Sequence, residues 1–222
     1  MLVRPATVGD LRAVAEIQQK IHPCTAQSVE SRERAFLTVN ERSRARYVVA
    51  EFDGRVAGYA SAMLDHTTSE PGAAVLSVGV HPRHRRRGAG TALLADAEAH
   101  LRSVGAVTVR VWRPDEQGSA VFAERHGYRR RRSRRFSVTD PRQAPPAAAA
   151  PDGMCLVDLD EAGRDAVYTF DRVAPLDEPG DRPAGVTAAY TSSDATNTPM
   201  FVVNDRLGYQ PAATEHPEVR QA

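Results

Sequence analysis

Apolar residues in the first part of the chain recur at helical spacing and then at strand spacing. Leu11, Val14, Ile17 and Ile21 lie three or four positions apart, which predicts a helix with one buried face that ends before Pro23. We expect a first strand at 3–5, a second helix over 29–42, and strands at 46–52 and 56–64. Asp53-Gly54 between these two strands is typical of a two-residue hairpin turn.

A longer apolar run follows at 74–80 and predicts a buried strand, which Pro82 ends because proline has no N–H to donate. Leu93, Ala97 and Leu101 then repeat every four positions, so a helix runs from about Gly90 to about Gly105. Strand-like alternation returns at 107–111 and predicts a strand–helix–strand crossover with parallel strands. We also expect a return strand at 129–138.

The turn between that apolar strand and its helix carries the clearest chemistry. Glycines at positions 88 and 90 leave backbone N–H groups accessible at a helix N-terminus. Unpaired donors and aligned peptide dipoles there favour an anion such as a diphosphate. Arg85 and Arg86 add positive charge, although a solvated basic turn is an alternative interpretation of the arginines at 83–87. The sequence therefore predicts an anion-binding turn.

Composition indicates a globular protein without a strong net field. The chain has 222 residues, with 29 Lys and Arg against 28 Asp and Glu. The net charge is therefore too small to attract nucleic acid or a membrane surface. The arginine-rich run at 129–135 is interpreted as a solvated strand, with nucleic-acid binding as the rival. No apolar run reaches the roughly 18 residues of a membrane span, and we expect a cytoplasmic protein. Cys24 and Cys155 have no metal-ligand spacing and are expected to be reduced thiols.

The pattern Arg85-x-x-Gly88-x-Gly90 after a strand ending in Val-x-Pro resembles the acetyl-CoA signature of the GCN5-related N-acetyltransferase (GNAT) family. The resemblance covers about residues 1–140. It implies an α/β (α+β) GNAT fold, with a mixed, mostly antiparallel sheet flanked by helices and two parallel strands that splay around the pantetheine arm. The cofactor-binding residues that it implies are Val78, Gly79, Val80, Arg85, Arg86, Arg87, Gly88, Ala89, Gly90 and Thr91.

The reaction that the resemblance implies is direct transfer of an acetyl group from acetyl-CoA to a primary amine, without a metal. The acceptor is expected to be a small molecule or a peptide, and a homodimer is compatible with the family. Ser77 stands where the family often has a glutamate, which leaves Asp65, His66 and Glu70 as candidate bases or as solvated loop residues.

The general acid of the family is commonly a tyrosine four residues before a Gly-aromatic pair. Counting back from Gly127 gives Ala123, and counting back from Gly208 gives Asn204, neither of which can act as an acid. The catalytic residues are therefore left unassigned. A non-catalytic acyl-CoA-binding or interaction module is the alternative function.

Beyond the first domain, residues 141–151 are rich in proline and alanine and predict a linker. Residues 152–222 resemble a partial second GNAT unit, with Asn197 and the pair Gly208-Tyr209 at family spacing but no second Arg-x-x-Gly-x-Gly. We thus expect a GNAT domain at 1–140, a linker at 141–151 and a degenerate second unit at 152–222, as in a tandem GNAT protein with a truncated second half.

Overall fold

The computed structural model describes residues 1–25, 27–68, 70–131, 133–140, 142, 163, 189–194, 198–206 and 209–221. These belong to two compact units, one of Met1–Arg135 with Ala213–Ala222 and one of Phe136–Ala212. Our sequence division placed residues 213–222 in the C-terminal unit, whereas the structure places them in the first. The predicted linker, apart from residue 142, and most of the predicted second unit lie outside the described residues.

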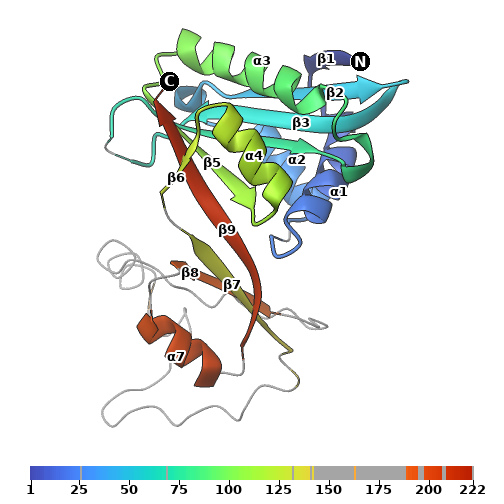
Figure 1. The fold of residues 1–222 in the computed structure, drawn as a ribbon. Helices are drawn as coiled ribbons and strands as arrows, with labels where there is room; N and C mark the ends of the chain where they lie inside the picture. The colour runs from blue at the N-terminus through green and yellow to red at the C-terminus, as the bar shows by residue number, and fades with distance from the viewer. Residues whose placement is uncertain are drawn as a thin grey trace. The chain divides into compact units, whose positions relative to one another are not determined.

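The first unit is built on a mixed sheet with the strand order β1-β2-β3-β4-β5-β9, in which β6 also pairs with β9 (Figure 1). Every pair is antiparallel except β4–β5, so the expected mixed, mostly antiparallel sheet is confirmed. The strands are β1 (Leu2–Pro5), β2 (Arg46–Phe52), β3 (Arg55–Leu64), β4 (Ala73–Val80), β5 (Thr108–Pro114), β6 (Arg129–Arg130) and β9 (Gln210–Gln221).

Helices cover both faces of this sheet. The helices are α1 (Leu11–Ile21) and α2 (Val29–Leu37) on one face, and α3 (Ala89–Ser103) and α4 (Gln117–Arg125) on the other, with short 3-10 turns η1 (Val8–Asp10), η2 (Glu41–Ser43) and η3 (Pro82–His84). Adjacent strand residues face opposite layers, so Val48 packs under α3 while Val49 packs under α1. No helix among the described residues has both the length and the apolarity that a bilayer crossing needs.

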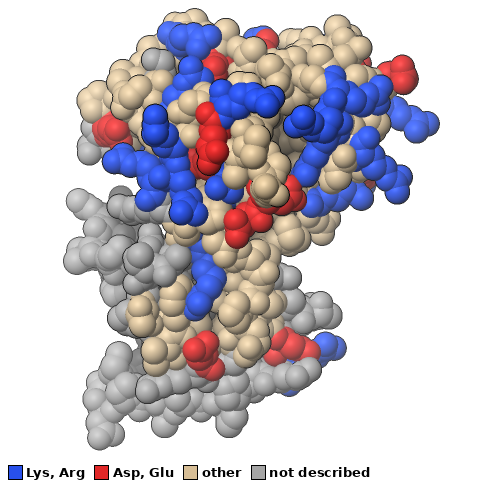
Figure 2. All heavy atoms as spheres, viewed as in Figure 1, with Lys and Arg blue, Asp and Glu red and all other residues tan. Residues whose placement is uncertain are grey.

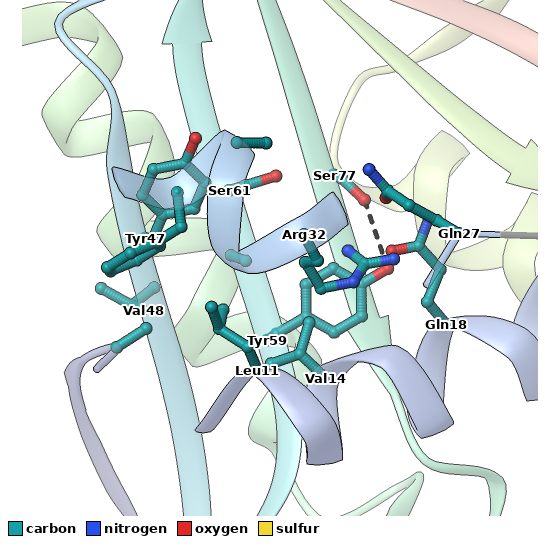
Figure 3. Close-up of a pocket in the computed structure, with 14 residues that line it drawn as sticks. Leu11, Val14, Gln18, Gln27, Arg32, Tyr47, Val48, Tyr59, Ser61 and Ser77 are labelled. Atoms are coloured by element: carbon teal, nitrogen blue, oxygen red, sulfur yellow. Dashed lines mark hydrogen bonds between the residues drawn. The ribbon is translucent and has the colours of Figure 1, made fainter. Parts of the chain in front are cut away.

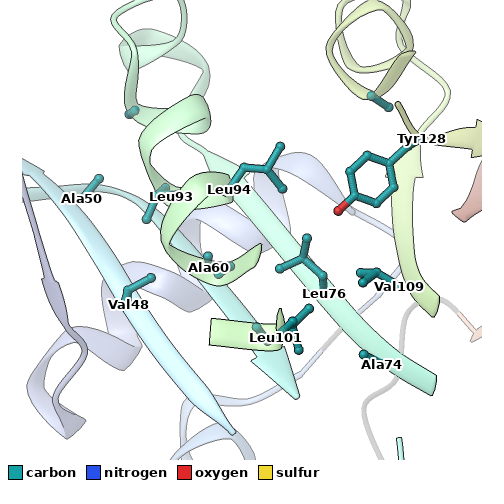
Figure 4. Packing of buried hydrophobic residues seen from close by; sticks show 14 residues of the cluster. Val48, Ala50, Ala60, Ala74, Leu76, Leu93, Leu94, Leu101, Val109 and Tyr128 are labelled. Atoms are coloured by element: carbon teal, nitrogen blue, oxygen red, sulfur yellow. The ribbon is translucent and has the colours of Figure 1, made fainter. Parts of the chain in front are cut away.

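The larger core lies between α3 and the sheet (Figure 4). Leu93 and Leu101 of α3 and Leu76 of β4 are fully buried there. Burying one such leucine contributes about 1.5–3 kcal/mol. This packing fixes the start of α3 against the end of β4, where the anion-binding turn was predicted.

Two predicted elements differ from the expectation, one by ending early and one by being divided into two strands. The helix predicted over 29–42 ends at Leu37, because Asn40 begins the separate turn η2 by accepting a hydrogen bond from the N–H of Arg42. The return strand predicted over 129–138 is broken after Arg130. Arg131 donates its N–H to the carbonyl of Pro217 at 3.1 Å, but proline has no N–H to return, so the ladder stops there.

The second unit contains most of β7 (Arg134–Thr139), which begins two residues before it, together with β8 (Ala189–Asp194) and α7 (Thr198–Arg206), and β7 pairs with β8. Phe136 is buried, and Asn204 of α7 is buried and accepts the N–H of Tyr209 on its backbone carbonyl at 2.9 Å. Asn197 and Gly208, which suggested a second GNAT unit, lie outside the described residues. The assignment of this segment as a degenerate repeat therefore stays a prediction.

Candidate active site

Strands β4 and β5 separate part of the way along their length. They pair in parallel over only four positions, from Ala73 with Thr108 to Leu76 with Val111. Both strands continue, β4 to Val80 and β5 to Pro114, and in the described chain no β4 residue after Leu76 pairs with β5. Strand β3 pairs with the opposite edge of β4. The backbone N–H and C=O groups of residues 77–80 on the edge that faces β5 can therefore form hydrogen bonds with an extended ligand.

The turn after β4 presents backbone N–H groups to the same opening. Arg86 and Gly88 have positive φ values of 62° and 86°, which turn the chain into α3. The first backbone hydrogen bond of α3 runs from the N–H of Ala92 to the carbonyl of Gly88 at 3.1 Å, so the N–H groups of the preceding residues have no helical partner. A helix start of this form is a ready site for a phosphate.

A cleft of about 360 Å³ joins the turn, the separated strands and α4. Its walls include these predicted cofactor residues: Val78, Val80, Arg85, Arg86, Gly88, Ala89, Gly90 and Thr91. Phe122 of α4 closes one side, and a Cβ added to Gly90 would lie 3.4 Å from its ring. A small side chain at position 90 would therefore be in contact with this ring, and glycine leaves that space open.

Two predicted cofactor residues do not line this cleft. Gly79 faces the other side of the sheet, where an added Cβ would clash with the ring of Tyr59. The guanidinium of Arg87 lies 4.0 Å from the centre of the Phe52 ring, an electrostatic attraction that directs it elsewhere.

Arg85 reaches the cleft but already has partners. Its Nη1 lies 2.8 Å from Oε2 of Glu116, and its Nε donates to the carbonyl of Val80 at 3.4 Å. A phosphate in the cleft would compete with Glu116 for this guanidinium. On the face shown in Figure 2, basic side chains gather beside the start of α3, while the rest of that face mixes both signs.

A second pocket of about 260 Å³ lies on the opposite face of the sheet, among α1, α2 and the middle strands (Figure 3). Its apolar walls include Leu11, Val14 and Phe36, and its polar groups are Gln18, Gln27, Arg32, Tyr47, Tyr59, Ser61 and Ser77. The hydroxyl of Tyr59 lies 3.5 Å from Oγ of Ser77, and burial raises the pKa of this tyrosine. Ser77 directly precedes Val78, so the pocket and the cleft lie against opposite faces of the same part of β4.

A buried His–carboxylate pair lies at the end of α1. Nδ1 of His22 is 2.6 Å from Oε1 of Glu215, and the two side chains are only 11% and 10% exposed. In the tautomer that carries its proton on Nδ1, the ring donates to this carboxylate and Nε2 has a lone pair that can accept a proton. Neither His22 nor Glu215 is in the wall of the cleft or of the second pocket, but Ile21, the preceding residue, lines the cleft, and Gln18, one turn earlier, lines the second pocket.

The candidate bases from the sequence lie at the other end of β4. Asp65 donates its N–H to the carbonyl of Ala73 at 2.8 Å, and Val78 is five residues further along the strand, or about 17 Å at 3.3 Å per residue. The Asp65 carboxylate pairs with Arg110 at 2.6 Å, and hydrogen bonds from Thr67 lower its pKa.

The other two candidates are held in the same loop. Nδ1 of His66 is 2.9 Å from Oγ of Ser43, and Glu70 is exposed. All three are therefore structural or solvated residues rather than groups beside the cleft.

At the position where the family commonly has its general-acid tyrosine, this chain has a buried core residue. Ala123 of α4 is 6% exposed and packs in the larger core. Tyr128 is also in that core, where its hydroxyl donates to Glu98 at 2.9 Å, and Asn204 belongs to the second unit. Within the described part of the chain, no three His, Cys, Asp or Glu side chains gather as metal ligands.

Comparisons with known proteins agree with this geometry. Residues 11–128 match the model of the Acetyltransferase (GNAT) family. The chain is 33% identical over 153 residues to mycothiol acetyltransferase of Nocardia farcinica, a match that covers 67% of this chain and 45% of the relative. The chain thus spans less than half the length of that protein.

Solved structures give the same fold. Ribosomal-protein-alanine N-acetyltransferase of Brucella melitensis is 25% identical, with a TM-score of 0.52 over 61% of this chain and 88% of that one. A tandem GNAT protein from the clavulanic acid biosynthesis pathway has a TM-score of 0.74 over 99% of this chain and 98% of its own, at 18% identity. The family match covers the splayed strands and the turn that starts α3, and this chain belongs to the Acetyltransferase (GNAT) family.

Proposed function

We propose that the chain binds acetyl-CoA in the cleft and transfers the acetyl group directly to a primary amine. The observation that carries the proposal is the separation of β4 from β5 beside the free N–H groups at the start of α3. Charge-assisted N–H bonds to a diphosphate contribute about 1.5–3 kcal/mol each, more than the roughly 0.3–1 kcal/mol of the helix dipole. The backbone of the turn therefore dominates binding of the phosphates.

The pantetheine arm would extend from the turn along the free edge of β4, past Val80 and Val78. Its thioester would then lie near Ser77, where the cleft meets the second pocket. An amine in that pocket approaches the thioester from the face of the sheet that α1 and α2 cover. The amine nitrogen attacks the carbonyl carbon, the C–S bond breaks, and the CoA thiolate leaves.

An alkyl amine with a pKa of about 10.4 is almost fully protonated at pH 7, so attack requires a base. We propose His22 for this role, because it directly follows Ile21 in the cleft wall and because Glu215 can accept Nδ1–H, which leaves Nε2 to take the amine proton. Water returns a proton to the thiolate. Replacing His22 by Gln should lower kcat/KM by about 100-fold or more. His66→Gln is the matched control, because this exposed histidine lies in the loop before β4.

Ala123 at the usual tyrosine position favours the alternative of a non-catalytic acyl-CoA-binding module. Release of CoA thiol, together with mass detection of an acetylated amine from a broad amine panel, separates the two. If acetyl-CoA raises the melting temperature but no amine is acetylated, the binding module is the correct function. If acetyl-CoA has no effect on the melting temperature, both proposals fail.

A further inference from the structure

Arg32 in the second pocket forms no ion pair with any acidic residue that the structure describes. It extends from α2 to the ring of Tyr59, near Gln27 and Ser77 (Figure 3). Its Nε is buried, and no atom in the described chain forms a hydrogen bond with it. Burial lowers the pKa of this guanidinium. A half-buried guanidinium in a pocket is stabilised when an anion enters beside it.

The pocket itself supplies no such anion. None of the residues that line it is an aspartate or a glutamate. Other arginines of the first unit do have acidic partners, as in the pairs Arg4–Asp10, Arg46–Asp96 and Arg110–Asp65. Arg32 thus differs from them in facing a cavity instead of a carboxylate.

We propose that Arg32 binds a carboxylate of the acceptor, so that the acceptor is a small amino carboxylate with an apolar substituent. A planar guanidinium matches a carboxylate with two parallel hydrogen bonds. Leu11, Val14 and Phe36 offer an apolar wall for the substituent, and Tyr59 with Ser77 lies on the thioester side for the amine. This inference rests on the proposed acetyl transfer, because it names the acceptor of that site.

Pocket size is consistent with such a ligand. The volume of about 260 Å³ is just below the roughly 300 Å³ at which sites for drug-sized ligands begin. An α-amino acid with a branched or aromatic side chain is the simplest molecule that presents an amine, a carboxylate and an apolar group together.

Calorimetric titration of the full chain saturated with CoA tests this inference without turnover. The probes are L-leucine and L-phenylalanine, the amides of both, and isoamylamine. We expect at least one amino acid to bind about 10- to 100-fold more tightly than its amide, a ratio typical of hydrogen bonds to a charged group. Arg32→Gln should remove that difference, and Arg34→Gln, at an exposed position of the same helix, should keep it.

Three results would overturn the proposed carboxylate-binding site. They are equal affinity for an amino acid and its amide, equal affinity of the wild type and Arg32→Gln for the amino acid, and no binding of either amino acid. CoA titration of Arg32→Gln verifies that the variant is folded. Acetylation assays separate this inference from the proposed function. If amines with and without a carboxylate are acetylated equally well, the proposed acetyl transfer is supported and this inference is wrong. If amino acids bind in an Arg32-dependent way but no amine is acetylated, the carboxylate-binding site is supported and the proposed acetyl transfer is wrong.

Discussion

Replacing Gly90 by Glu should abolish acetyl-CoA binding. Gly90 is the second residue of α3 and lines the cleft, and a Cβ placed there would lie 3.4 Å from the Phe122 ring and 3.7 Å from Val80. A longer side chain at this position would enter the cleft that Phe122 and Val80 also line, and its carboxylate would repel the phosphates of a bound cofactor.

The size of the effect follows from Coulomb's law. Two like unit charges about 5 Å apart at an effective dielectric constant of about 20 repel by about 3 kcal/mol. A single such pair weakens binding by more than about 100-fold, and a diphosphate presents more than one negative charge. Loss of an N–H contact adds about 1.5–3 kcal/mol for each bond that the side chain blocks.

Isothermal titration with acetyl-CoA at low and high salt measures this effect, with Gly90→Gln as the control of equal shape. We expect Gly90→Gln to bind weakly and Gly90→Glu to bind far more weakly, with the difference shrinking at high salt. The reasoning is refuted if both variants bind acetyl-CoA as the wild type does, since the phosphates then lie elsewhere.

Three further predictions concern stability and charge. Leu93→Ala should destabilise the first unit by about 2–5 kcal/mol in urea unfolding, because the side chain is fully buried against the sheet; a change under about 1 kcal/mol would contradict the packing. Hydrogen bonds from Arg4 hold the pKa of Asp10 well below its usual range, so this stabilisation is present above about pH 4 and is lost as the pH falls. Asp10→Asn should accordingly melt lower at pH 7 and lose less stability on acidification, and an unchanged pH profile would count against the pair. Glu116→Gln should raise acetyl-CoA affinity by up to about 5-fold at low salt, because it releases Arg85; weaker binding would indicate that Glu116 helps to hold the cofactor.

The features that the sequence predicted well have local causes. Phe52 pairs with Arg55 across Asp53-Gly54, whose positive φ values of 51° and 72° suit the two-residue turn. The turn between β4 and α3 was predictable for the same reason, since glycine spacing and a proline stop act over a few residues. The buried stripe of α1 likewise follows from helical spacing alone.

The features that the sequence did not predict depend on distant contacts. Strand β9 contains Pro211 and Pro217 and few large apolar residues, yet it pairs with β5 from Thr108 to Pro114. Its buried Glu218 is stabilised by an ion pair with Arg113 that no local pattern indicates.

The sequence alone did not indicate the proposed base, His22, or the cation proposed to bind the acceptor, Arg32, for the same reason. His22 and Glu215 are 193 positions apart and meet only in the folded sheet. Arg32 is one arginine among many in the sequence, and only the pocket around it distinguishes it. A hydrogen bond or a cavity between remote segments leaves no periodic signal in the chain.

The most direct test of the central claim is a titration of isotope-labelled protein with acetyl-CoA, followed through backbone amide resonances. The site described here predicts large shifts for Gly88, Gly90, Val78 and Val80, and little change for Asp65 at the far end of β4. Absence of shifts at Gly88 and Gly90, or shifts confined to another part of the chain, would contradict acetyl-CoA binding at the start of α3.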